Sequence, residues 1–404
     1  MICNSVAAGV IVAHWLGAEG VGQLAVINVA VTTIVQLGSF GLPSSNTYFI
    51  AKDRAHFRAA TTNSLLFALL AGSLFAIVLS VVASLRPTWF GFVPPDLIRI
   101  ASVSIPFQLL TLIGLNILLA VGKIRDFNLL DLAGQSFVLI NALVVLIILR
   151  GRLDGLVKLN TATSIAVGIV VAALLLIEGK KLVDSKWRAD AALLRRMITY
   201  GVKFHISVLA AAIIFRADLL VVNHFRGPAE AGVYSVATQF SLLLMLLPGV
   251  IATLLFPRVT AEQDAHGETT SVVTRHTALI MLGCCLATVP VSFLLPLVYG
   301  KAFSDATMLL LILLPGVYLV GLESVLVQHF NALGLPRRIP VYWLVTLVIN
   351  LVLVFGLVPR LGARGAAIAS TLSYALIFCL IAWHFRTSTR RSFGEVFVRG
   401  SLRG

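Results

Sequence analysis

The chain has 404 residues, of which 59% are hydrophobic and only 12% are charged, whereas soluble domains are about a quarter charged. Its mean hydropathy of +0.98 requires most of its surface to face lipid, which excludes an ordinary soluble domain. In a soluble protein the net charge of +14 would suggest nucleic acid binding. Here Lys and Arg lie in short loops between apolar runs, so we expect no nucleic acid partner.

Apolar runs of roughly 18 to 25 residues follow one another along the chain, the length at which an α-helix crosses about 30 Å of hydrocarbon. A transmembrane β-barrel would instead alternate in polarity over segments of about ten residues. The first run is short for a crossing, so we expect that the chain begins inside its first helix. The sequence predicts an all-α membrane protein of about twelve spans, at 2–16, 24–42, 62–84, 98–121, 127–149, 154–178, 201–223, 232–256, 272–299, 306–332, 339–358 and 364–385.

Residues 179–200 separate the sixth and seventh spans. Apolar residues recur there at helical spacing, from Val183 and Trp187 to Leu194 and Ile198, and Lys or Arg fills many of the other positions. We expect a basic amphipathic linker helix that lies on an anionic lipid surface. The predicted organisation is an N-terminal six-helix lobe (1–178), this linker (179–200), a C-terminal six-helix lobe (201–386) and a cytoplasmic tail (387–404).

The loops alternate in charge along the chain. Of the 31 Lys and Arg residues, 21 lie in the linker, the tail and the loops on the same side of the predicted topology. Nine lie on the opposite side, and Arg216 lies within a span. Because cytoplasmic loops carry the excess of basic residues, we expect both termini in the cytoplasm.

The two halves repeat in parallel. The segment from His14 through Gly17 and Gly22 aligns with the segment from His224 through Gly227 and Gly232, and Gly155 aligns with Gly365, all at a shift of 210 residues. Gly122 aligns with Gly334 at a shift of 212. Parallel repeats of six spans predict two lobes related by an axis along the membrane normal, with a central cavity between them.

Short segments spread along the chain resemble one family in their order and spacing. They are Leu16–Gly22, Arg216–Asp218, Gly232–Ala237, Phe256–Arg258, Tyr299–Phe303, Asn331–Gly334 and Gly362–Ala369. With these segments the chain resembles the polysaccharide-export flippases, of the O-antigen type, in the multidrug/oligosaccharidyl-lipid/polysaccharide superfamily.

The resemblance implies a flippase of the bacterial cytoplasmic membrane. Such a protein moves a polyprenyl-diphosphate-linked oligosaccharide from the cytoplasmic to the periplasmic leaflet by alternating access, in the synthesis of surface polysaccharide. It also implies as partners the polymerase and glycosyltransferases of the same pathway.

A diphosphate headgroup requires cations inside the spans, because each charge costs several kcal/mol in hydrocarbon. Arg216 and His205 are 11 residues apart, about three helical turns, and therefore share one face of the seventh span. We predict that Arg216, His205 and Asp218 all contact the substrate. The alternative for Arg216 is a packing role, paired with Asp218 or with a neighbouring helix.

Glu323 is a lone acid deep in the apolar run at 306–332. An ionisable residue at such a depth is by default a candidate functional group. We predict that it couples proton or sodium movement to transport. The alternative is a carboxyl group that is hydrogen-bonded inside the bundle.

Two spans carry polar stripes at spacings of three or four residues. One consists of Asn28, Thr32 and Gln36, and the other of Asn128, Asp131 and Gln135. In lipid such a face turns inward, either to line a cavity for sugar hydroxyls or to form hydrogen bonds between helices. We predict that Asn28, Gln36, Asp131 and Gln135, together with Asn350, contact the substrate.

Two other interpretations of the function are a different transporter of the same superfamily and a membrane enzyme. A lipid II flippase or a cation-coupled drug antiporter of the same superfamily is an alternative, although the former usually has two further helices and the latter needs no cationic path. A membrane enzyme of polysaccharide assembly would need a large external loop or a catalytic domain. The sequence contains no phosphate-binding Gly-rich loop with Lys and no HExxH motif, and its four cysteines lie in apolar runs. We therefore predict no enzymatic activity, no cofactor and no metal.

Overall fold

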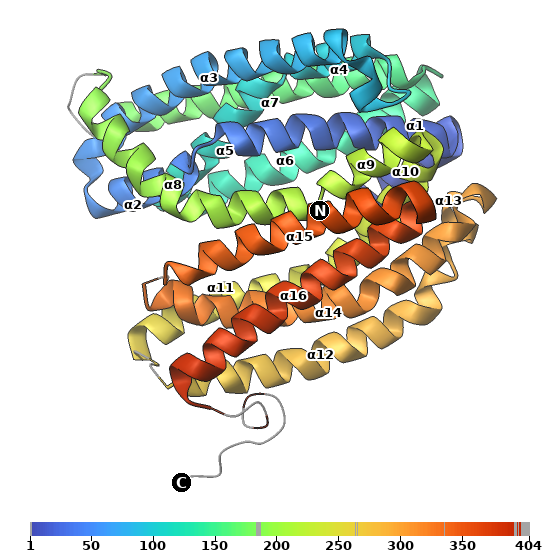
Figure 1. The fold of residues 1–404 in the computed structure, drawn as a ribbon. Helices are drawn as coiled ribbons and strands as arrows, with labels where there is room; N and C mark the ends of the chain where they lie inside the picture. Colours follow the sequence, from blue (N-terminus) through green and yellow to red (C-terminus); the bar gives the residue numbers. More distant parts are fainter. Residues whose placement is uncertain are drawn as a thin grey trace. The chain divides into compact units, whose positions relative to one another are not determined.

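The computed structural model of the protein describes residues 2–182, 187–262, 264, 266–334, 336–391, 394 and 396. Most of these residues are helical, and none of them lies in a β-strand (Figure 1). Contacts within the chain define two compact units. Unit 1 consists of Met1–Arg216 and Gly227–Gly232, and unit 2 of Ala217–Arg226 and Val233–Gly404.

Unit 1 contains the helices α1 (Ile2–Gly38), α2 (Leu42–Lys52), η1 (Arg54–His56), α3 (Phe57–Leu85), η2 (Pro87–Phe90), α4 (Pro95–Ser102), α5 (Ile105–Ala120), α6 (Ile124–Ala142), the π-helix η3 (Leu143–Ile148), α7 (Leu153–Leu182) and α8 (Ala191–Ile214). The apolar helix α5 is the core of this unit. It packs against α2, α3 and α7, and it buries Leu109, Ile113 and Ile117 at spacings of four residues. α1 packs against α6, and α2 packs against α8.

Unit 2 contains α9 (Ala217–Arg226), α10 (Pro228–Leu244), α11 (Leu246–Glu262), α12 (Glu268–Ser292), α13 (Leu295–Tyr299), η4 (Lys301–Phe303), α14 (Ser304–Ala332), α15 (Arg338–Leu361) and α16 (Ala363–Thr389), except for the first turn of α10, which lies in unit 1. The central helix here is α14. It packs against α11, α12 and α16 and is buried along most of its length, whereas α15 packs on α16 (Figure 1).

Ten helices of the described residues are long and apolar enough to span a membrane, and the bent pair α4–α5 makes an eleventh. α1 has 37 residues, about 55 Å at 1.5 Å per residue, but it is interrupted at Gly17, whose φ of 67° and ψ of −174° are not helical. This break separates the first two predicted spans. Each of the twelve predicted spans therefore corresponds to a helical segment, and the prediction of an all-α membrane protein is confirmed.

The predicted span at 98–121 is bent because of Pro106. The axes of α4 and α5 differ by 41°. Pro106 has no N–H group to donate to the carbonyl of Ser102, four residues earlier, and its ring crowds that carbonyl, so the helical hydrogen bonds are interrupted where α4 ends. Pro106 occupies the first turn of α5, where a missing N–H group is tolerated.

The backbone carries marks of the sequence repeat. Gly17 and its counterpart Gly227 both have positive φ, at 67° and 89°, and so do Gly122 and Gly334, at 81° and 107°. α7 begins at Leu153 and α16 at Ala363, again 210 residues apart. Corresponding helices therefore begin and break at corresponding places, as expected for a parallel repeat.

The structure differs from the expected single linker helix at 179–200. Residues 179–182 complete α7, residues 187–190 are not helical, and α8 begins at Ala191. Val183 and Lys186 of the predicted amphipathic pattern lie outside the described residues. The break has a local cause. The Asp190 carboxylate accepts a hydrogen bond from the Leu193 N–H at 2.9 Å and so starts a new helix, and Asn63 holds the Asp190 backbone at 2.8 and 3.0 Å.

Contacts also assign α8 to unit 1, although the seventh span was expected to open the C-terminal lobe at residue 201. Gly41 and Gly201 let α8 approach the start of α2 closely, since a Cβ added to Gly41 would lie 2.4 Å from the Gly201 carbonyl oxygen. The Ser45 hydroxyl donates a hydrogen bond to the Met197 carbonyl at 2.6 Å. At the other end of the chain, α16 continues into the expected tail as far as Thr389.

Candidate functional site

Unit 1 contains a half-open cavity of about 640 Å³. α1, α5, α6 and α7 supply most of its wall, and Arg216 contributes from the turn after α8. Apolar residues such as Val31 and Phe137 line much of it. The uncharged polar lining residues are Asn28, Thr32, Gln36, Ser104, Gln108, Thr111, Asn141, Asn160, Thr161, Thr163 and Ser164.

The charged part of this lining is positive only, among the described residues. Arg216 is its one cation, and no Asp or Glu is found among the described lining residues. An anion in the cavity would therefore meet one guanidinium group and no repelling carboxylate. Amide and hydroxyl groups supply the other polar contacts, as in sites that bind a small polar ligand.

Arg216 is positioned by an interruption of the predicted seventh span. Residues 215 and 216 form a turn between α8 and α9, and the Arg216 N–H donates to the Ile213 carbonyl at 3.1 Å. The side chain is exposed, and within the described part of the chain it has no ion pair or hydrogen bond. Its guanidinium group is thus available to a ligand.

Asp218 does not pair with Arg216. It is buried in unit 2, where its carboxylate accepts hydrogen bonds from the Tyr234 hydroxyl, from the Ser370 hydroxyl at 2.8 Å and from the Leu219 N–H at 2.8 Å. These donors join α9, α10 and α16. The packing alternative raised for Arg216, a pair with Asp218, is not observed, and Asp218 itself does not line the cavity.

The polar stripe of α1 lies on the cavity wall. Asn28, Thr32 and Gln36 all line it. The Thr32 hydroxyl donates to the Asn28 carbonyl at 2.7 Å, whereas the side-chain amides of Asn28 and Gln36 have no partner among the described residues. These two amides can therefore form hydrogen bonds with a ligand.

The second polar stripe, on α6, is not part of the cavity lining. Gln135 donates to the Asp131 carboxylate at 3.2 Å, and neither residue lines the cavity. α6 turns a neighbouring face towards the cavity, with Phe137 and Asn141 one turn apart. The spacing of 128, 131 and 135 identified a polar face but not the element that it meets.

Several cavity residues were not predicted from the sequence. Asn141 donates to the Asn160 side-chain oxygen at 2.8 Å and to the Thr163 hydroxyl at 3.0 Å, and Gln108 donates to Ser104 at 2.9 Å. The spacing of Asn160, Thr163 and Ser164 within one predicted span was a readable signal of a polar face on α7.

The remaining predicted site residues lie outside this cavity. His205 is buried in α8, with its imidazole against the backbone of Gln36 and Leu37. In unit 2, Asn350 donates to the Ser373 hydroxyl at 3.0 Å and so joins α15 to α16. Glu323 is 2% exposed in α14, and one of its carboxyl oxygens has no hydrogen-bond partner among the described residues.

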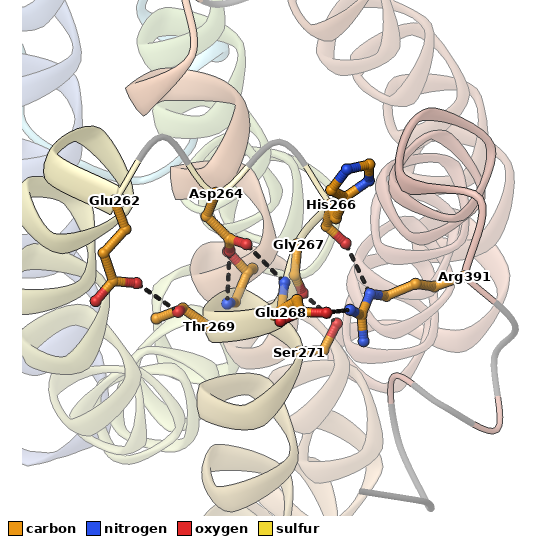
Figure 2. Close-up of polar contacts among 9 residues, drawn as sticks. Glu262, Asp264, His266, Gly267, Glu268, Thr269, Ser271 and Arg391 are labelled. Carbon is orange, nitrogen blue, oxygen red and sulfur yellow. Dashed lines mark hydrogen bonds and ion pairs between the residues drawn. The ribbon is translucent and has the colours of Figure 1, made fainter. Parts of the chain in front are cut away.

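A second polar cluster ties the turn between α11 and α12 to the end of α16 (Figure 2). The Asp264 carboxylate accepts hydrogen bonds from the N–H groups of Glu268 at 2.7 Å and Thr270 at 3.1 Å, in the first turn of α12. The Arg391 guanidinium donates to the His266 carbonyl at 2.7 Å and pairs with Glu268 at 2.6 Å. This cluster lies in unit 2 and contains no cavity residue.

Comparison with known proteins gives the family. Residues 8–263 match the family described as "Polysaccharide biosynthesis protein". Over 167 residues, 39% of the chain, it is 29% identical to the "Probable flippase AglR" of Haloferax volcanii. Over 181 residues, 42% of the chain, it is 25% identical to the "Probable low-salt glycan biosynthesis flippase Agl15" of the same organism. The matched segments cover 35% and 37% of these relatives.

Solved structures share the fold over nearly the whole chain. A lipid II flippase, MurJ, in an inward closed conformation matches 95% of this chain and 85% of its own, with a TM-score of 0.77 and 15% identity. An inward-facing multidrug resistance transporter of the MATE family, within the MOP superfamily, matches 96% of this chain and 95% of its own, with a TM-score of 0.76 and 15% identity. At this identity the likeness concerns the fold alone.

Proposed function

The chain belongs to the polysaccharide biosynthesis protein family, and we propose that it is a flippase. Its substrate is an oligosaccharide linked through diphosphate to a polyprenyl lipid, which it moves from the cytoplasmic to the outer leaflet for cell-surface polysaccharide synthesis. The two named relatives are described as flippases, which supports this proposal.

The observation that carries the proposal is Arg216, the one cation among the described lining residues of the cavity, whose guanidinium group has no partner among the residues that the structure describes. A diphosphate cannot cross hydrocarbon unaided, because each charge costs several kcal/mol there. A guanidinium group offers a planar fork of N–H donors that matches two phosphate oxygens. The cavity lining that the structure describes adds no carboxylate to oppose the phosphate.

The rest of the headgroup needs hydrogen bonds. Sugar hydroxyls lose water when they enter a membrane protein, and the unpaired amides of Asn28 and Gln36 can replace that water. The polyprenyl tail needs no such site, because it remains in lipid. A cavity of about 640 Å³ in unit 1 therefore suits the polar part of the substrate only.

Transport proceeds in this proposal by alternating access between two six-helix repeats. The segment 179–200 links the N-terminal repeat to the C-terminal repeat. The protein lies in the bacterial cytoplasmic membrane with both termini in the cytoplasm, as the charge of the loops indicates. The basic residues of 179–200 bind anionic lipids, and the polymerase and glycosyltransferases of the pathway are partners.

Two other substrates suit the same fold. A multidrug transporter and a lipid II flippase are both structurally similar to this chain, so the fold does not select among cargoes. A drug antiporter has no need of an unpaired guanidinium in its cavity. The substrate must therefore be tested directly.

The test uses the full-length protein reconstituted in liposomes. A polyprenyl diphosphate carrying a short oligosaccharide is included on both leaflets, and an added glycosidase digests only outward-facing glycan. Movement of the protected fraction to the outer leaflet is followed with time. Lipid II and a cationic drug serve as the competing cargoes in parallel vesicles.

We expect transport of the oligosaccharide lipid and at least a ten-fold loss of rate in Arg216→Ala, with Arg216→Lys intermediate because an ammonium group lacks the bidentate fork. Arg360→Ala is the matched control. Arg360 is exposed at the end of α15, and within the described residues its guanidinium group contacts only the Gly356 carbonyl, at 3.5 Å. Transport of lipid II or drug alone, or an unchanged rate in Arg216→Ala, would contradict the proposal.

A further inference from the structure

The cavity has a second polar feature, on helices that do not adjoin the turn of Arg216. Asn141 of α6 and Asn160, Thr163 and Ser164 of α7 form a connected group on the cavity wall, which we call the amide wall. Asn141 is 3% exposed, whereas the other three are half-buried at the cavity. Asn141 is therefore fixed inside the protein, whereas the side chains of Asn160, Thr163 and Ser164 are open to the cavity.

The hydrogen bonds of the amide wall determine what it presents to a ligand. The Asn141 amide nitrogen donates at 2.8 Å to Asn160, so the accepting atom of Asn160 is its Oδ1. The Nδ2 of Asn160 then carries two N–H donors, and no described residue accepts from them. Asn160 thus offers donors in a fixed orientation.

Ser164 supplies the opposite polarity one helical turn further on. Its hydroxyl donates at 2.8 Å to the Asn160 backbone carbonyl, which leaves the oxygen as an acceptor. Donor and acceptor groups four residues apart lie on the same face of α7. This pairing matches vicinal sugar hydroxyls, each of which both donates and accepts.

An aromatic ring adjoins the amide wall. Phe137 lies on α6 one turn before Asn141, lines the same cavity and is 36% exposed. Its ring offers an apolar surface for the C–H face of a pyranose. An apolar platform with a few oriented polar groups is the usual composition of a site that discriminates small ligands.

We propose that the amide wall and Phe137 form a sugar subsite that selects an uncharged pyranose of the transported glycan. This inference rests on the proposed function, and it assigns to α6 and α7 a role separate from phosphate binding by Arg216. The sugar is uncharged because the described cavity lining contains no carboxylate that could neutralise an amino sugar.

A sugar subsite and a purely structural role of the same hydrogen bonds lead to different expected transport rates. If Asn141 and Asn160 only held α6 against α7, their loss would slow the transport of every cargo equally. A sugar subsite instead affects only cargoes that carry the sugar. The informative quantity is therefore the ratio of two transport rates, for glycan-bearing and for glycan-free polyprenyl diphosphate, in the same protein.

The test measures both rates in liposomes for wild type, Asn160→Ala, Asn160→Asp and Ser164→Ala. Within the described residues the Ser164 hydroxyl bonds only to its own helix, so Ser164→Ala leaves the contact between α6 and α7 intact even if the Asn160 variants fail to fold. Ser84→Ala is the matched control. The Ser84 hydroxyl makes the same kind of bond within α3, to the Ser80 carbonyl at 2.9 Å, but Ser84 is exposed and does not line the cavity.

We expect Asn160→Ala and Ser164→Ala to lower the rate for the glycan-bearing lipid by about ten-fold and that for the glycan-free lipid by less than about two-fold. Asn160→Asp should in addition raise the relative rate of a glycan that carries a free amino sugar. Ser84→Ala should change neither rate.

Equal losses for both lipids, or no loss for either in Ser164→Ala, would overturn the sugar subsite while leaving the flippase proposal intact. If wild type moves neither lipid, the proposed function fails instead. The two failures are thus distinguishable in one set of vesicles.

Discussion

Gly22 and Gly232 pack against each other at corresponding positions of the two repeats, each against the backbone four residues before the other. A Cβ added to Gly22 would lie 1.7 Å from the Pro228 carbonyl oxygen, and one added to Gly232 would lie 2.0 Å from that of Ala18. Ala18 and Pro228 are themselves 210 residues apart. The contact is therefore reciprocal, like an isologous interface between identical subunits.

This reciprocity leads to the first prediction. Gly22→Ala places a methyl group where a backbone carbonyl lies, so the helices must separate, at a cost of about 2 kcal/mol or more. The midpoint of thermal unfolding in detergent should fall by several degrees, and Gly232→Ala should have a similar effect. Gly356→Ala is the control, because a Cβ there meets no atom within 4 Å. A midpoint equal to that of the control would contradict the contact.

The second prediction concerns Asp218, which we expected at the substrate but which the structure places among three donors in unit 2. Asp218→Ala leaves the hydroxyls of Tyr234 and Ser370 buried without their acceptor, so we expect a loss of about 3 kcal/mol. Thermal unfolding and the level of protein in the membrane should both report it. Asp305→Ala should be nearly neutral, since Asp305 is exposed and its pair with Arg364 is 4.0 Å long.

Arg216→Ala should behave in the opposite way from Asp218→Ala. No described residue depends on the Arg216 side chain, so its removal should leave the unfolding midpoint within about a degree of wild type while transport falls. If Arg216→Ala unfolds as early as Asp218→Ala, the assignment of Arg216 to the ligand is wrong. The comparison separates a binding residue from a packing residue two positions away.

The spans and the repeat could be predicted from the sequence because both follow from local physical demands. A helix in lipid must be apolar over its whole length, so hydropathy placed each of the twelve predicted spans on a helical part of the chain. The repeat was visible because Gly17 and Gly227 adopt a backbone conformation that side chains disfavour. Such positions retain their residue type even where the surrounding apolar residues differ.

The cavity was only partly predictable, because helical spacing defines a face but not its neighbour. Asn28 and Gln36 face the cavity, whereas Asp131 and Gln135 on another span do not. Asn160 lies in a span for which the sequence predicted no site residue, and its orientation depends on Asn141, 19 residues earlier. The turn at residues 215 and 216, which exposes Arg216, also has no Gly or Pro to mark it.

The third prediction concerns the cluster at the start of α12 (Figure 2). Asp264 satisfies two N–H groups of the first helical turn that have no partner within the helix. Asp264→Ala should therefore cost about 1 kcal/mol and increase protease cleavage in the turn between α11 and α12. Glu262→Ala is the matched control, since Glu262 is an exposed carboxylate at the end of α11 whose hydrogen bonds, with Arg258 and Thr269, involve side chains only and satisfy no backbone N–H group. Equal cleavage in both variants would refute the capping role.

The last prediction concerns Glu323 and the energy source of transport. Its carboxyl group is buried in the central helix of unit 2, with one oxygen unpartnered among the described residues, so an ionised form would be costly without water or a cation. We propose that the Glu323 carboxyl group ionises only in a conformation that admits water or a cation to it. This step would couple transport to an ion gradient. Glu323→Gln keeps the shape of the side chain but cannot ionise.

In liposomes with an imposed pH or sodium gradient, wild type should transport faster than without one. Glu323→Gln should retain the rate measured without a gradient and lose the acceleration. Glu230→Gln, at the start of α10, is the control and should keep the acceleration. An acceleration in Glu323→Gln equal to that of wild type would show that this carboxyl group has no part in coupling. In that case the buried carboxyl group would serve only the packing of α14, because a neutral Gln of the same shape can replace it there.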